Sequence, residues 1–149
     1  FKQFLLREVE VLNILTILRL KKANFEKEAI KEFVIPSDDK IKDDNMMKLV
    51  NAPKIEDALN LLEKSNFGGV ARKGIDELKA TGSLMTVENE LYKSLLKGTV
   101  LLSHQYPLSI DTILGYMFAK DIEVRNLRIV VKAKQFGLSE EFIENQLVY

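Results

Sequence analysis

Cysteine is absent from this 149-residue chain. Without a thiol there is no disulfide, no thiolate metal ligand and no cysteine nucleophile. A metal site would therefore have to rest on carboxylates and on the single histidine, His104. Histidine near a helix end with no second ligand nearby is typical of a surface or capping residue, so we expect neither a metal nor another cofactor.

Net charge and long apolar runs are also missing. The 22 basic and 22 acidic side chains cancel, which argues against a nucleic-acid footprint over the whole domain. The apolar runs are too short to cross a bilayer and no signal peptide is visible, so we expect no direct membrane insertion. The chain starts at Phe1 in the middle of an amphipathic pattern, and we expect it to be a fragment of a longer protein.

Proline and glycine are scarce, with three and seven residues, and the apolar residues recur at helical spacing. No segment shows the alternation of a half-buried strand. The sequence therefore predicts an all-α fold, a bundle built from duplicated helix–turn–helix units. The expected helices are 1–22, 26–35, 46–50, 55–64, 70–79, 87–105, 109–135 and a short one from about residue 140, with a charged loop before the third and breaks at 66–69, 81–83 and 106–108.

A repeat links the two ends of the chain. A shift of 113 residues superposes residues 1–35 on residues 114–148 without a gap. Asn24 then falls on Gly137, and these two residue types best tolerate the left-handed position that ends a helix. We read residues 1–36 and 114–149 as two copies of one helix–turn–helix unit, with the intervening helices in 37–113.

Both copies carry a cation, a glutamate and an asparagine at three-residue steps within an apolar pattern. These residues are Arg7, Glu10 and Asn13 in the first copy, and Lys120, Glu123 and Asn126 in the second. Such spacing aligns the side chains along one side of a helix, where they can bond in sequence. A catalytic site is one interpretation. We favour a structural polar ladder that fixes helix register, with both asparagines largely buried and bonded outside their own helices, since an unpaired polar group in an apolar seam costs about 1–3 kcal/mol.

Other motifs do not complete a chemical site. Residues 69–74 have the glycine spacing of a phosphate loop but lack the lysine and hydroxyl that must follow. The acidic loop at 38–44 lacks the glycine and distal glutamate of a calcium loop. Arg125, Arg128, Lys132 and Lys134 form a basic sector without interleaved aromatics, which is typical of a solvated helix face. We therefore predict no catalytic, cofactor-binding or metal-binding residues.

Residues 107–128 resemble a signature of one family. Pro107-Leu108-Ser109, the Gly115-Tyr116 pair and the run from Lys120 to Arg128 are similar to the C-terminal signature of the C subunits of archaeal and bacterial A/V-type ATP synthases, relatives of the d subunit of eukaryotic V-ATPases. Asp121 stands where that signature more often has glutamate. The run Arg7-Glu8-Val9-Glu10-Val11-Leu12-Asn13 resembles the same signature in a preceding repeat.

The resemblance implies a function that the residues alone do not. It implies the later part of an all-helical, pseudo-threefold, funnel-shaped protein on the cytoplasmic face of the membrane. Such a protein joins the central-shaft subunits D and F to the membrane proteolipid ring, and it couples ATP to proton or sodium transport without chemistry of its own. The alternatives are a generic helical-repeat adaptor that binds a partner protein, and an acid–base enzyme using Glu10 or Glu123.

Overall fold

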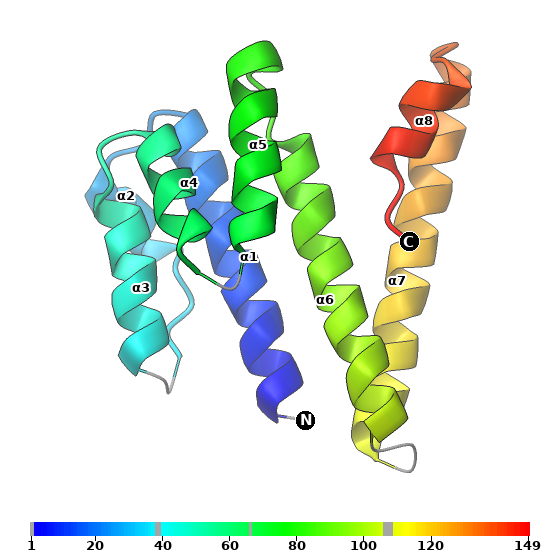
Figure 1. The fold of residues 1–149 in the computed structure, drawn as a ribbon, viewed down its shortest axis with the longest axis horizontal. Coiled ribbons are helices and arrows are strands. Elements are labelled where there is room, and N and C mark those ends of the chain that lie inside the picture. Colours follow the sequence, from blue (N-terminus) through cyan, green and yellow to red (C-terminus); the bar gives the residue numbers. More distant parts are fainter. Residues whose placement is uncertain (1, 38–39, 66, 106–108) are drawn as a thin grey trace. The chain divides into compact units, whose positions relative to one another are not determined.

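The computed structural model describes residues 2–37, 40–65, 67–105 and 109–149. Side chains are described throughout these ranges except at 40–42, 100 and 102–105. All regular structure in these ranges is helical (Figure 1). The all-α prediction is confirmed. The turn expected at 106–108, the first two acids of the charged loop and the side chain of His104 lie outside the described residues.

Eight helices make up the described chain. They are α1 (Lys2–Lys22), α2 (Lys27–Glu32), α3 (Lys40–Asn51), α4 (Ile55–Glu63), α5 (Gly68–Thr81), α6 (Met85–Gln105), α7 (Ile110–Gln135) and α8 (Glu140–Gln146). They fall into two compact units, Lys2–Leu91 and Tyr92–Tyr149, with the boundary inside α6. We call them the N-terminal unit and the C-terminal unit.

In the N-terminal unit, α1 packs against α2, α3 and α4, and α4 packs against α5 (Figure 1). The core draws on every one of these helices and on the start of α6. Its fully buried large side chains are Val11, Ile14, Ile17, Leu18, Ile30, Val50, Leu59, Val87 and Leu91. Burial of one such side chain contributes about 1.5–3 kcal/mol, so this core is the main source of stability of the unit.

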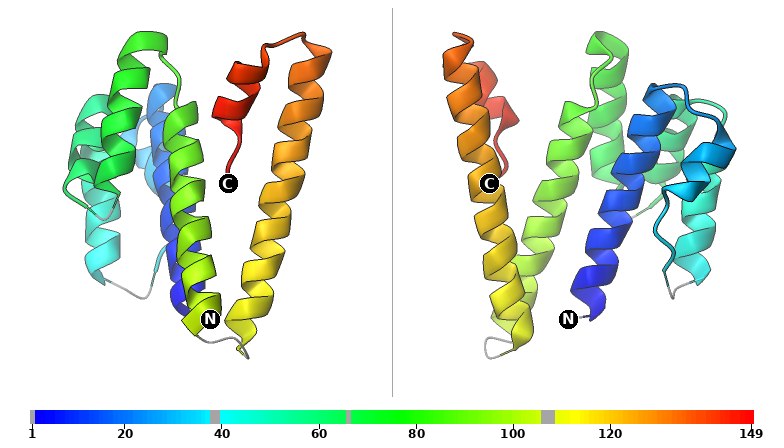
Figure 2. Two further views of the ribbon diagram at one scale, coloured as in Figure 1. Left: turned by 45° about the vertical axis from the view of Figure 1, so that its right-hand side comes forward. Right: turned by 180° about the vertical axis from the view of Figure 1, so that it is seen from behind.

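In the C-terminal unit, α8 folds back along α7 (Figure 2). Gly115 of α7 lies against Thr99 of α6, where an added Cβ would come within 2.8 Å of the Thr99 methyl carbon. The Arg125 guanidinium stacks on the ring of Tyr92, 4.3 Å from its centroid. A guanidinium over an aromatic face is attracted by the ring quadrupole. Both of these contacts join α7 to α6.

Helices α3, α5 and α6 begin earlier than the sequence predicted, with α6 starting at Met85 and not at residue 87. Helix α3 begins at Lys40, inside the expected charged loop, and Asp43 in its first turn accepts a hydrogen bond from the Ser37 backbone N–H at 3.0 Å. A carboxylate is favourable at a helix N-terminus, so the acids of this stretch start a helix. Helix α5 begins at Gly68, where a longer break was expected. Gly68 lies so close to the Glu63 carbonyl that no side chain fits there.

The two predicted left-handed turns are confirmed. Asn24 has φ 58° and Gly137 has φ 67°. In the first, the backbone N–H groups of Phe25 and Asn24 donate to the carbonyls of Leu20 and Lys21. The second turn repeats this pattern, from Leu138 to Ala133 and from Gly137 to Lys134. This pair of bonds is the Schellman motif, which satisfies the last carbonyls of a helix.

Candidate functional site

Asn13 and Asn126 each form two hydrogen bonds with a backbone segment 22 residues later in the chain. The Asn13 amide nitrogen donates to the Ile35 carbonyl at 2.8 Å, and its oxygen accepts from the Ile35 N–H at 2.9 Å. Asn126 does the same with Val148, at 2.7 and 3.1 Å. We call each arrangement an asparagine clasp. The predicted bonding outside the parent helix is confirmed.

The two clasps differ in burial. Asn13 is 3% exposed, whereas Asn126 is half-buried. The helix before Pro36 is also shorter than expected. Helix α2 ends at Glu32 and not at Ile35. Ile35 needs its own N–H and carbonyl for the clasp, so it cannot continue the helix. Tertiary bonding has replaced the last turn that the sequence predicted.

The remaining ladder residues lie nearer the solvent. The Lys120 ammonium donates to the Glu123 carboxylate at 2.6 Å, and both side chains are more than half exposed. This hydrogen bond, with the attraction of the carboxylate, raises the pKa of Lys120. Of the apolar residues near Glu123 in α7, Ile122 is buried, whereas Val124 and Leu127 are exposed. Arg7 is exposed and Glu10 half-buried, and the full three-residue ladder stays a prediction.

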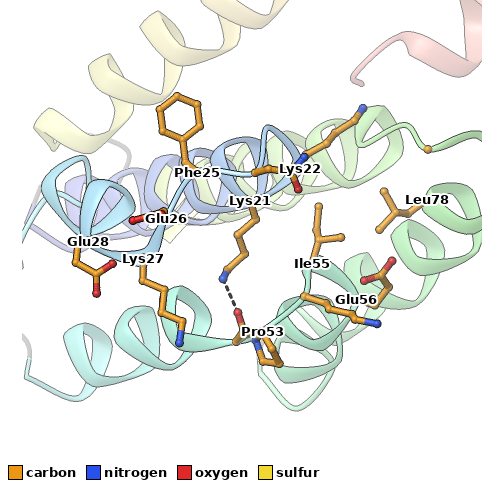
Figure 3. A pocket seen from close by; sticks show the side chains of 14 residues that line it. Lys21, Lys22, Phe25, Glu26, Lys27, Glu28, Pro53, Ile55, Glu56 and Leu78 are labelled. Carbon is orange, nitrogen blue, oxygen red and sulfur yellow. Dashed lines mark hydrogen bonds between the residues drawn. The ribbon is translucent and has the colours of Figure 1, made fainter.

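Lys21 and Lys134 occupy equivalent positions but have different partners. The Lys21 ammonium donates to the carbonyls of Val50 at 2.8 Å and Ala52 at 2.6 Å, which ties the end of α1 to the end of α3. Figure 3 draws the second of these bonds. Lys134 instead pairs with Glu140 at 2.8 Å. The carbonyls at a helix C-terminus carry partial negative charge, so a lysine there is stabilising.

A surface hollow of about 840 Å³ surrounds Lys21 (Figure 3). The hollow lies where α1, α3 and α5 end and where α2 and α4 begin, and it mixes four lysines with three glutamates. These charged residues are Lys21, Lys22, Glu26, Lys27, Glu28, Lys54 and Glu56. Burial, and then the charge of Lys27, lowers the pKa of the Lys21 ammonium below its usual 10.5. Because the Lys21 ammonium already donates two hydrogen bonds to backbone carbonyls, its role here is to hold α1 and α3 together.

A second hollow, of about 270 Å³, includes Glu10. It lies beside α1, α3 and α4 and is lined by Ile14, Leu49 and Leu62 among others. Ser65 also borders it, but its hydroxyl donates to the Leu62 carbonyl at 2.7 Å. A nucleophile needs an adjacent base that accepts its proton, and this hydroxyl gives its proton to the backbone. The Ser65 hydroxyl is therefore not arranged as a nucleophile with Glu10 as its base.

Within the described residues, no three histidine, aspartate or glutamate side chains gather where they could hold a metal ion. The glycines at 68, 69 and 74 belong to α5, so the stretch with phosphate-loop spacing forms a helix. None of the described helices is long and apolar enough to cross a membrane.

Comparison with known proteins gives a consistent result. A family model described as the ATP synthase (C/AC39) subunit matches residues 1–146. Proteins named as the C subunit of A-type ATP synthase are similar to almost the whole chain. The one from Methanococcoides burtonii is 34% identical over 99% of this chain and 41% of its own length. Those from Methanosarcina acetivorans and Archaeoglobus fulgidus are 36% and 32% identical, each over 99% of this chain and 40% and 41% of their own lengths.

The chain thus spans about two fifths of the length of these relatives. No solved structure matches it.

Proposed function

Since this chain belongs to the ATP synthase (C/AC39) subunit family, we propose that it is part of a non-catalytic central-stalk subunit of an A/V-type rotary ATPase. In this role it joins the rotating shaft, subunits D and F, to the membrane proteolipid ring. It lies peripherally on the cytoplasmic face and couples ATP turnover to proton or sodium transport. The observation that carries the proposal is the family match over residues 1–146.

Local structure supports a mechanical role. A part that transmits torque must keep its helices in a fixed register. In each helix–turn–helix, the Schellman turn fixes where the long helix ends, and the asparagine clasp fixes the segment that follows the short helix. Two bonds made by one side chain set both position and direction, which a single apolar contact does not. The polar residues thus have a structural use that needs no substrate.

Binding to isolated partners tests the proposal. Immobilised chain is incubated separately with detergent-solubilised proteolipid rings and with a D–F shaft complex, and retained proteins are identified by mass spectrometry. The full-length relative from Methanococcoides burtonii serves as the positive control. We expect this chain to retain at least one of the two partners.

Circular dichroism must first show that the immobilised chain is helical. A folded chain that retains neither partner, while the control retains both, contradicts the proposal. Retention of unrelated helical proteins in place of ring or shaft would favour the generic adaptor.

A further inference from the structure

We draw no further inference here: the strongest candidate, the surface hollow around Lys21 where α1, α3 and α5 end, sets four lysines against three glutamates, its Lys21 ammonium already binds the carbonyls that end α3, and nothing in the structure shows what else would fill it.

Discussion

At the scale of single residues, the asparagine clasp is the feature with the clearest energetic consequence. The amide supplies one donor and one acceptor, and both are used by the same backbone residue. A hydrophobic residue of similar size would leave the N–H and carbonyl of Ile35 or Val148 without these partners. An unpaired buried polar group costs about 1–3 kcal/mol.

Asn13→Ala and Asn126→Ala should each lower the free energy of unfolding by about 1–3 kcal/mol, with the larger loss at Asn13 because it is more deeply buried. Urea titration monitored by circular dichroism measures this. Asn60→Ala, at an exposed position of α4, is the control and should change stability by less than about 0.5 kcal/mol. Equal stability of Asn13→Ala and the original chain would show that the clasp contributes nothing.

Two glycines of α5 give a second residue-scale prediction with opposite signs. A Cβ at Gly74 would collide with the Val87 side chain, whereas at Gly69 it would meet open space. Gly74→Ala should therefore destabilise by about 1–3 kcal/mol through overpacking. Gly69→Ala should stabilise by up to about 1 kcal/mol, since alanine loses less backbone entropy in a helix. Thermal unfolding of both variants separates them, and destabilisation by Gly69→Ala would contradict the open environment of that position.

At the scale of helices, the ion pair between Lys134 and Glu140 joins α7 to α8. The hydrogen bond from the Lys134 ammonium, with its charge, lowers the pKa of the Glu140 carboxyl from its usual 4.5. A lowered carboxyl pKa stabilises the fold above the unfolded value, and this contribution is lost as the pH falls through the folded value. Both side chains are exposed, so the effect on stability is small.

Lys134→Met should therefore return the Glu140 carboxyl pKa toward 4.5, as followed by NMR titration of the Glu140 side chain. Lys132→Met, which removes an exposed charge nearby on the same helix, is the control and should leave the Glu140 carboxyl pKa lowered. A Glu140 pKa that stays low in Lys134→Met would mean that another group causes the shift.

How far sequence predicts these helices depends on what ends and covers them. The left-handed turns at Asn24 and Gly137 follow from local chemistry, so they could be predicted. The early end of α2 could not, because it depends on a bond to a residue 22 positions away. The exposure of the Glu123 side chain could not be predicted either. A helix that is apolar on two sides gives no sequence signal for which side packs first.

At the scale of the whole molecule, the duplication of the helix–turn–helix stays a prediction, although turns and clasps correspond at every step described. The candidate site could likewise be predicted only in part. Asn13 and Asn126 were found from their place in an apolar pattern, and their backbone partners were not. The hollow around Lys21 has no local sequence signal, since its residues come from the ends of several helices.

The proposed coupling role predicts a specific failure. Asn126→Ala combined with Glu123→Ala, placed in the complete stalk protein of an assembled rotary ATPase, should leave ATP hydrolysis by the catalytic head largely intact while ATP-driven ion pumping falls. The reason is that a loosened stalk part transmits less torque but performs no hydrolysis. Pumping is measured as an ion gradient in vesicles and hydrolysis as phosphate release.

The composition of the complex must be checked in the same preparation, since loss of the stalk protein would also abolish pumping. An intact complex that pumps normally despite a destabilised clasp would contradict the role of the clasp in coupling. If the catalytic head detached from the variant complex no longer hydrolysed ATP, the non-catalytic assignment itself would be contradicted.

The clasps have a further consequence, because an amide carries no net charge. Added salt weakens the attraction between the exposed side chains of Lys134 and Glu140. The screening length of the solution shortens from about 10 Å at about 0.1 M to about 3 Å at about 1 M ionic strength. The bonds from Asn126 to Val148 involve no ions and are not screened in this way. As ionic strength rises, the charged link between α7 and α8 therefore weakens while the neutral one holds, and the end of the chain stays fastened to α7 in dilute buffer and in brine alike.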